Sequence, residues 1–243
     1  MTLYWIKKVN GKKQRIWNYG RSRGLKEAKN ILGDVEKEVK LLLKNKKQIK
    51  ILEVGCGYGR ILLELKKKYK DRVETFGINK EPRWNLKLIE VFGVAEGIFS
   101  KKEIAKNLPK LVICDVNNKI PFKNNTFDFV FSERTIQYLS NKAKYLEELN
   151  RVTTKDGTIL TDIQNGTENR WEIFKKGKKV NIYSILSQKK GIKLQKEKGN
   201  PKDKFLRMQK QSNFKLNLTL VSSQDLHKLN PDKWGTKSTF NSK

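Results

Sequence analysis

Three glycines at alternate positions lie between a short apolar stretch and a helix-like one. Gly55, Gly57 and Gly59 come directly after Ile49–Val54 and before Arg60–Tyr69. This spacing lets the backbone turn tightly and approach a ligand without Cβ atoms in the way, and the helix start offers free N–H groups to a carboxylate or phosphate. The pattern G-x-G-x-G differs from the G-x-G-x-x-G of dinucleotide-binding folds. We interpret the segment as a ligand site, and a tight turn without a ligand is the alternative.

The glycine turn belongs to a repeating pattern of short β-forming stretches and amphipathic helices. Strands are predicted at Ile49–Val54, Val73–Ile78, Leu111–Cys114, Phe127–Phe131 and Thr158–Ile163, and helices at Arg60–Tyr69, Arg83–Phe92 and Lys142–Val152. Strands that alternate with helices favour a parallel sheet with right-handed crossovers. The sequence therefore predicts an α/β protein, with the glycine turn at the sheet edge where such folds bind ligands.

The motifs that follow the glycine turn resemble those of the class I S-adenosylmethionine-dependent methyltransferases. In that family an acid precedes x-G-x-G-x-G, as Glu53 does here. The run from Ile120 to Val130 resembles the family's LPF-x-D-x-S-F-D-x-V segment, and Leu149–Gly157 resembles its RVLKPGG turn. The resemblance covers about residues 49–163. It implies a Rossmann-like, doubly wound, mostly parallel seven-stranded sheet with helices on both faces, and S-adenosyl-L-methionine as the cofactor.

The resemblance also implies which residues surround the cofactor. They are Glu53, Gly55, Cys56, Gly57, Gly59, Asn79, Asp115 and Val116. Asp115 would contact the adenine amino group, and Val116 would cover the ring edge. Asn79 stands where the family usually has an acid that holds the two ribose hydroxyls. An amide still donates and accepts hydrogen bonds, but it carries no charge. We therefore expect Asn79→Asp to tighten cofactor binding if the amide contacts the ribose.

The residues after the fourth predicted strand are expected to face the transferred methyl group. They are Ser132, Glu133 and Arg134, with Gln137 and Tyr138 further along. Glu133 is suited to accept a proton or hold a cationic acceptor, and Arg134 to bind an anionic one. The pair fits an exposed helix start equally well. The motifs N-P-P-Y and Pro-Cys do not occur, which counts against the adenine and cytosine C5 methyltransferases that carry them.

The chain is strongly basic. Lys plus Arg number 54 against 25 for Asp plus Glu, a formal net charge of +29, and most of the excess lies outside residues 51–162. Such a charge suits a polyanion such as RNA, although the codon bias of an AT-rich genome also enriches lysine. We divide the chain into a basic N-terminal flank or lid at residues 1–48, a methyltransferase core at 49–163, and a basic C-terminal part at 164–243 that completes the sheet and ends in a flexible tail.

The flanks contain four segments with an interpretable pattern. Arg15–Gly24 interleaves arginines with Trp17 and Tyr19, as a lid over the cofactor or a nucleotide clamp would, and we favour the lid. The stretch with Arg170–Trp171 and Lys175–Lys179 adds positive surface, although a lysine run is usually a solvated face. Lys189–Lys204 is predicted to be an exposed loop and Lys215–Ser223 a late antiparallel strand.

Some classes of protein are not indicated by the sequence. Cys56 and Cys114 lie in apolar runs rather than at zinc or disulfide spacing, and the sole histidine, His227, is interpreted as a surface residue, so no metal site is predicted. The first residues form no apolar signal segment, and no apolar run approaches the about twenty residues of a membrane helix. We expect a soluble, intracellular protein of the cytoplasm, with no membrane partner.

Taken together, the motifs predict a methyltransferase that moves a methyl group to an O or N acceptor, with RNA as one candidate. A methyltransferase for a small molecule or a protein is the alternative. So is a non-catalytic, methyltransferase-like RNA-binding or scaffold subunit, which the amide at Asn79 keeps open. The identity of the acceptor and the oligomeric state do not follow from the sequence.

Overall fold

The computed structural model describes residues 4–9, 12–17, 23–117, 119–139, 142–163, 171–175, 178–180, 186–197, 200–212, 214 and 219–222. Their strands are β1 (Tyr4–Val9), β2 (Lys12–Trp17), β3 (Ile49–Val54), β4 (Val73–Asn79), β5 (Lys110–Ile113), β6 (Phe127–Ser132), β7 (Thr153–Ile163), β8 (Trp171–Lys175), β9 (Lys178–Val180), β10 (Ile192–Glu197), β11 (Asn200–Gln209) and β12 (Thr219–Ser222). Their helices are α1 (Leu25–Leu32), α2 (Val35–Asn45), α3 (Arg60–Tyr69), α4 (Leu86–Ala95), α5 (Ile104–Asn107) and α6 (Lys142–Val152), with short 3-10 helices η2 (Lys70–Arg72) and η3 (Ile136–Tyr138).

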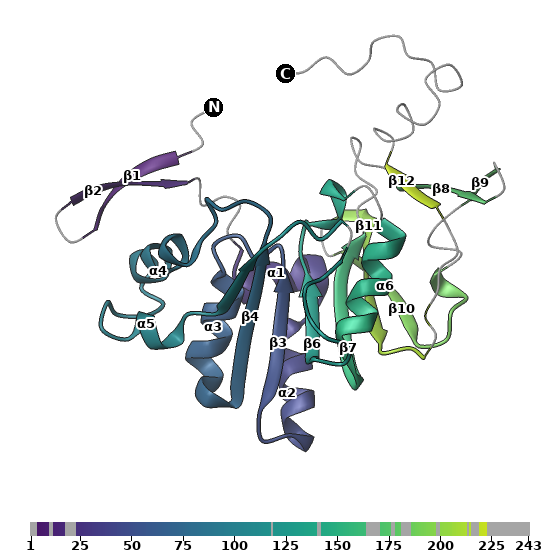
Figure 1. The fold of residues 1–243 in the computed structure, drawn as a ribbon, viewed down its shortest axis with the longest axis horizontal. Helices are drawn as coiled ribbons and strands as arrows, with labels where there is room; N and C mark the ends of the chain where they lie inside the picture. The colour runs from purple at the N-terminus through teal and green to yellow at the C-terminus, as the bar shows by residue number, and fades with distance from the viewer. Residues whose placement is uncertain are drawn as a thin grey trace, which may run out of the picture.

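Seven strands form one central sheet in the order β10-β11-β7-β6-β3-β4-β5 (Figure 1). The five strands from β5 to β7 pair in parallel, and β11 is antiparallel to both of its neighbours. The chain starts this sheet at β3, builds β4 and β5 on one side, and then returns to build β6 and β7 on the other. The turn after β3 therefore lies at the switch point where open α/β sheets bind ligands. The predicted α/β, mostly parallel seven-stranded sheet is confirmed.

Helices cover both faces of the central sheet because the strands bury both of their faces. In β3, Ile51 packs in a cluster with side chains of α1, α2 and α3, whereas Leu52 packs in a second cluster with side chains of α6. β6 alternates in the same way, with Phe129 and Phe131 in the first cluster and Val130 in the second. All five side chains are fully buried. This is the near-continuous apolar pattern of parallel strands that lie between two helix layers.

The helices before β3 are part of the same core. Leu32 of α1 and Val39 of α2 are fully buried in the first cluster. Arg207 of β11 donates from Nε and Nη2 to the two oxygens of Glu38 in α2, at 2.7 and 2.8 Å. A bidentate pair of this kind fixes the orientation of both side chains. Both α1 and α2, which lie before the predicted core at residues 49–163, therefore pack with the sheet.

The structure differs from the sequence prediction at Lys189–Lys204. The prediction of an exposed loop there is wrong. β10 and the start of β11 occupy most of that segment. Ile192 and Leu194 alternate with the exposed Lys193 and Gln195, which is a strand pattern. Lysine is tolerated there because β10 is an edge strand of the sheet.

Two other predicted elements are shifted. The helix expected from Arg83 begins at Leu86, because Asn85 caps it by accepting a hydrogen bond from the Leu88 backbone N at 3.0 Å. Within the predicted late strand, residues 219–222 form β12, which is antiparallel to β8 in a separate sheet with β9.

The N-terminal flank includes a hairpin of β1 and β2, which projects beyond α4 at the left of Figure 1. The side chain of Trp17 and all of Tyr19 lie outside the described residues, as do Arg170, His227 and the side chains from 171 to 180. The lid and nucleotide-clamp interpretations of the N-terminal flank stay predictions.

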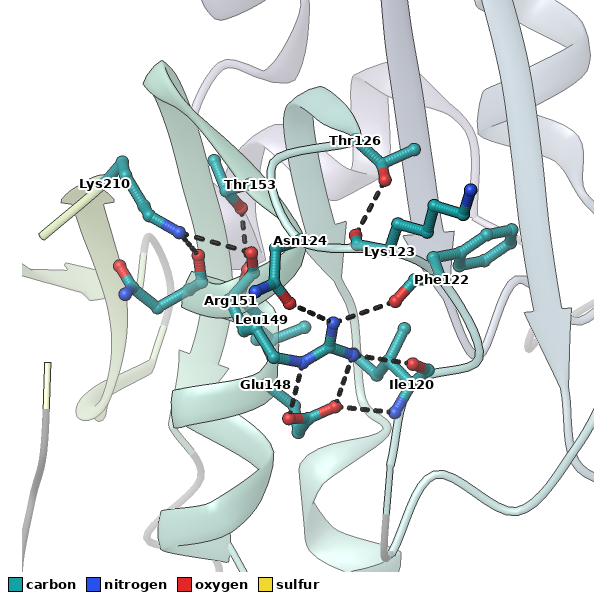
Figure 2. A network of polar contacts seen from close by, with 11 residues as sticks. Ile120, Phe122, Lys123, Asn124, Thr126, Glu148, Leu149, Arg151, Thr153 and Lys210 are labelled. Carbon is teal, nitrogen blue, oxygen red and sulfur yellow. Dashed lines mark hydrogen bonds and ion pairs between the residues drawn. The ribbon is translucent and has the colours of Figure 1, made fainter. Parts of the chain in front are cut away.

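One arginine holds the loop before β6 against the end of α6 (Figure 2). Arg151 donates from Nε and Nη2 to the Glu148 carboxylate, at 2.7 Å each. It also donates to the Ile120 and Phe122 carbonyl oxygens and to Asn124 Oδ1, at 2.8 Å each. Glu148 completes the network by accepting from the Ile120 backbone N at 2.9 Å. This network fixes the loop that leads from the end of β5 into β6.

We expect Arg151→Leu to destabilise the chain by about 3 kcal/mol, because it removes the arginine donors from the buried Glu148 carboxylate and from two carbonyl oxygens. Denaturant unfolding measures this loss. Arg151→Lys keeps the charge but has no planar set of five donors, so it should recover less than half of the lost stability. An Arg151→Leu variant as stable as the parent chain would show that the network carries no net stability.

Candidate active site

A cleft of about 960 Å³ opens at the carboxyl ends of the parallel strands. The residues that line it come from the ends of β3, β4 and β6, the loop after β5, and the segment before α1. They are Arg23, Val54, Gly55, Gly57, Ile78, Asn79, Lys80, Glu81, Arg83, Trp84, Cys114, Asp115, Val116, Asn117, Glu133, Arg134, Thr135, Tyr138 and Leu139. The cleft therefore brings together most of the residues that the sequence motifs single out.

The glycine turn forms one wall of the cleft. Gly55 N and Cys56 N both donate to the Ile78 carbonyl oxygen, at 2.8 and 3.1 Å, which ties the turn to β4. Gly55, Gly57 and Gly59 all have left-handed backbone conformations, with φ of 78°, 52° and 63°. At Gly55 a side chain is also excluded by space, since a Cβ would lie 1.9 Å from Thr135 Oγ1. Cys56 is buried, and burial raises the pKa of its thiol well above the ordinary value.

Glu53 lies at the end of β3, behind the turn, and is almost fully buried. Its Oε2 has no hydrogen-bond partner among the described residues. Burial, together with the nearby Glu133 carboxylate, raises the pKa of Glu53 well above its ordinary value. A buried carboxyl oxygen without a partner is costly for a protein to retain, and a cationic ligand group would supply the missing partner.

Asn79 closes the other side of the turn. Its Oδ1 accepts from Gly57 N at 2.8 Å, and its Nδ2 donates to the carbonyl oxygens of Gly57 and Trp84, at 3.1 and 2.8 Å. The side chain is buried.

Asp115 follows β5 on the far wall of the cleft. Its Oδ2 pairs with Lys80 Nζ at 2.8 Å, and its Oδ1 accepts from the Asn117 backbone N and side-chain Nδ2, at 2.9 and 2.7 Å. The hydrogen bond from Lys80 is the main reason that the pKa of Asp115 is lowered. Val116 is buried beside it. An exposed carboxylate and an apolar side chain at one place suit an amino-bearing aromatic ring.

The part of the cleft after β6 is lined by Glu133 and Arg134. Glu133 is 6% exposed at its side chain and pairs with Arg23 Nη1 at 2.8 Å. Burial raises the pKa of Glu133, and Arg23 opposes that effect. Arg134 adopts a left-handed conformation, with φ of 53°, and its backbone N donates to Asp162 Oδ1 at 2.8 Å. Asp162 is fully buried at the end of β7, and burial raises its pKa to about 7.

Ser132 does not line the cleft with its neighbours. Its hydroxyl donates to the Val54 carbonyl oxygen at 3.0 Å and accepts from Tyr145 Oη at 2.8 Å, and the residue is fully buried. Tyr138 lies at the cleft with 70% exposure, and the side chain of Gln137 lies outside the described residues.

Several residues of the cleft are not found from the sequence motifs. Arg23 lies in the Arg15–Gly24 segment, for which the sequence predicts a lid or a nucleotide clamp, and Thr135 directly follows Arg134, but the motifs assign neither residue a role in the cleft. Asp162 does not line the cleft but holds the backbone of Arg134 beside it, and its signal in the sequence is its place near the end of the last predicted parallel strand.

The geometry of the cleft agrees with the comparison to known families. Residues 45–213 match the family described as a methyltransferase domain. The chain belongs to this family. Its mostly parallel seven-stranded sheet and its glycine turn after β3 are those implied by the resemblance to class I S-adenosylmethionine-dependent methyltransferases. The cofactor of the methyltransferase domain is S-adenosylmethionine.

Curated relatives of the methyltransferase domain include two plant enzymes. The ajmaline N-methyltransferase of Rauvolfia serpentina is 32% identical over 117 residues, which is 47% of this chain and 36% of that protein. The norajmaline N-methyltransferase of the same plant is 29% identical over 118 residues, which is 48% of this chain and 36% of that protein. The chain thus spans only about a third of the length of these relatives.

Among solved structures, a SAM dependent methyltransferase from Aquifex aeolicus is similar, with a TM-score of 0.44 and 20% identity over 79% of this chain and 92% of that chain. The fold is assigned from the strand order of the central sheet.

The helices in the described ranges are all too short or too polar to cross a lipid bilayer. No group of three His, Cys, Asp or Glu side chains gathers in those ranges so as to hold a metal ion.

Proposed function

We propose that this chain is a methyltransferase that transfers the methyl group of S-adenosylmethionine to a nitrogen of a small amine. The observation that carries the choice of acceptor is Glu133, a carboxylate that lines the cleft and is held by Arg23 through one oxygen only. The N-methyltransferase names of the two plant relatives support a nitrogen acceptor. Amines are the acceptors that a carboxylate binds best, as ammonium ions or as N–H donors.

The residues present fit the cofactor. The unpartnered Oε2 of Glu53 suits the ammonium group of the methionine part. A Cβ at Gly57 would meet nothing within 4 Å, so the turn leaves open space for a ligand at the backbone. Asp115 and Val116 line the same cleft and would contact the adenine ring. When bound, the cofactor supplies a methyl group that its sulfonium has already activated.

The protein side chains then have to orient the acceptor and take up a proton. Glu133 would hold the acceptor nitrogen and accept the proton that a protonated amine must lose before it can attack. Its raised pKa suits that role, because a base works best when its pKa approaches the working pH. Asp162 fixes the backbone of Arg134 and thereby the direction of the segment after β6. Alignment of the acceptor in this way supplies much of the acceleration of a transfer reaction.

The proposal is tested by methyl transfer from radiolabelled S-adenosylmethionine to a panel of small primary and secondary amines, with matched alcohols. We expect label on amines only, and a Glu133→Gln variant whose kcat/KM for amines is about 10- to 100-fold lower. Glu90→Gln removes a carboxylate that pairs with Lys87 on α4, outside the cleft, and should leave kcat/KM unchanged. Label on alcohols, or a fully active Glu133→Gln variant, would contradict the nitrogen assignment.

RNA is a second candidate acceptor, favoured by the net charge of +29. An electrostatic RNA complex weakens steeply with added salt, because each phosphate contact releases a counterion. Label on RNA, together with affinity that falls about 1000-fold between 50 and 200 mM salt, would favour RNA. An RNA affinity that does not change with salt concentration would exclude RNA as the acceptor.

A further inference from the structure

The hydrogen bonds of Asn79 point to a role inside the protein that differs from a ribose contact. The amide has two N–H donors, and one lies on the Gly57 carbonyl oxygen while the other lies on the Trp84 carbonyl oxygen. Its oxygen accepts from Gly57 N. One buried side chain thus closes a three-bond clip between the glycine turn and the loop of residues 80–85.

The two segments joined by this clip form much of the cofactor cleft. Gly57 of the turn and Lys80, Glu81 and Trp84 of the loop all line it. The clip has an apolar part as well, because the Trp84 ring packs edge-on against Tyr58, with ring centroids 4.9 Å apart. Tyr58 follows Gly57 directly and is buried. The position of the loop therefore depends on contacts from the glycine turn.

An amide, and not a carboxylate, satisfies these three partners. A carboxylate only accepts hydrogen bonds, so at position 79 it would keep the bond from Gly57 N but would face two carbonyl oxygens without a proton between them. Two buried oxygens that face each other with no proton between them destabilise the fold by about as much as the loss of the two hydrogen bonds. The acid that the family usually has at this position would thus work against the clip in this chain.

We infer that Asn79 is a positioning residue, which locks the loop of residues 80–85 onto the glycine turn and so sets the shape of the cofactor cleft. The inference rests on the proposed function for its ligand. It reverses the expectation, based on the sequence alone, that an acid at this position would tighten cofactor binding.

The first test is titration of the full chain and its Asn79→Asp variant with S-adenosylhomocysteine by calorimetry. At pH 8 we expect the variant to bind at least about tenfold more weakly. The difference should narrow toward pH 5.5, because a protonated carboxyl group regains one donor. Binding by Asn79→Asp that equals or exceeds that of the parent chain at pH 8 would overturn the inference.

Asn85→Asp is the matched control, because it makes the same chemical change in the same loop. Asn85 Oδ1 caps α4. Its Nδ2 donates one hydrogen bond, to the Pro82 carbonyl oxygen at 3.1 Å. Aspartate caps helices as well as asparagine does. We expect Asn85→Asp to bind S-adenosylhomocysteine within about twofold of the parent chain.

The second test does not need the cofactor. Hydrogen–deuterium exchange of the ligand-free chain should show faster exchange at residues 55–59 and 80–85 in Asn79→Asp and in Asn79→Ala, which removes the same bonds without adding a charge. If Asn79→Ala exchanges at these residues as slowly as the parent chain, the inference is overturned, even if Asn79→Asp fails to fold. If the parent chain does not bind S-adenosylhomocysteine, the proposed function fails, while the exchange experiment still decides the role of Asn79.

Discussion

Gly55→Ala is expected to abolish cofactor binding and to destabilise the chain by more than about 3 kcal/mol. The backbone at Gly55 has φ of 78°, which L-residues rarely adopt, and an added Cβ would lie 1.9 Å from Thr135 Oγ1. Thr135 has little freedom to withdraw, because its hydroxyl donates to the Val54 carbonyl oxygen at 3.1 Å. The turn would have to move away from both β4 and the segment after β6.

The effect of Gly55→Ala is measured by chemical unfolding and by titration with S-adenosylhomocysteine. Gly97→Ala separates the backbone effect from the clash, because Gly97 has φ of 67° but nothing within 4 Å of an added Cβ. We expect Gly97→Ala to cost about 1 kcal/mol and to leave binding unchanged. Adding Thr135→Ala to Gly55→Ala removes the closest clashing atom and should recover part of the stability. A Gly55→Ala variant that binds as well as the parent chain would refute this account of the turn.

Glu53→Gln is expected to weaken cofactor binding about 10- to 100-fold while raising the stability of the ligand-free chain. The buried Oε2 of Glu53 has no hydrogen-bond partner among the described residues, so removing its charge relieves the ligand-free chain of a cost. The same change removes the anion that would pair with the ammonium group of the cofactor. Stability and binding should therefore change in opposite directions.

The pH dependence follows from the raised pKa of Glu53. The carboxyl group takes up protons more readily in the folded chain, so the stability of the ligand-free chain falls as pH rises from the unfolded pKa through the folded one. Cofactor affinity changes in the opposite direction and rises with pH as the carboxylate forms. Glu53→Gln should remove both dependences, as measured by thermal unfolding and titration at several pH values.

Glu148→Gln is the contrast for Glu53→Gln. Glu148 is equally buried, but its carboxylate pairs with Arg151, so its replacement should lower stability and leave cofactor affinity unchanged. Unchanged affinity in Glu53→Gln would show that Glu53 does not hold the cofactor.

The sheet and the glycine turn could be predicted from the sequence because the signals are local. The apolar runs of β3 and β6 and the periodicity of α3 and α6 are each complete within a few residues. The position of Asp115 after β5 could be predicted from the same local pattern. The edge strand β10 could not be predicted, because its alternation is short and its lysines resemble those of a loop.

The side-chain partners in the cleft depend on contacts between distant segments. Nothing near Asn79 in the sequence shows that its amide bonds to Gly57, and nothing near Arg23 shows that it meets Glu133. Ser132 is the last residue of β6, directly before Glu133, but it points into the core, where Tyr145 donates a hydrogen bond to it. A side chain at a strand end can face either way, and only the packing of the neighbouring elements decides which.

The most direct test of the account is calorimetric titration of the purified chain with S-adenosylmethionine and S-adenosylhomocysteine, alongside Asp115→Ala. We predict one site with a dissociation constant in the micromolar range, and loss of that binding in the variant, because Asp115 lines the cleft opposite the glycine turn. Absence of binding to either compound by the parent chain would contradict the account and would favour a non-catalytic, methyltransferase-like binding subunit.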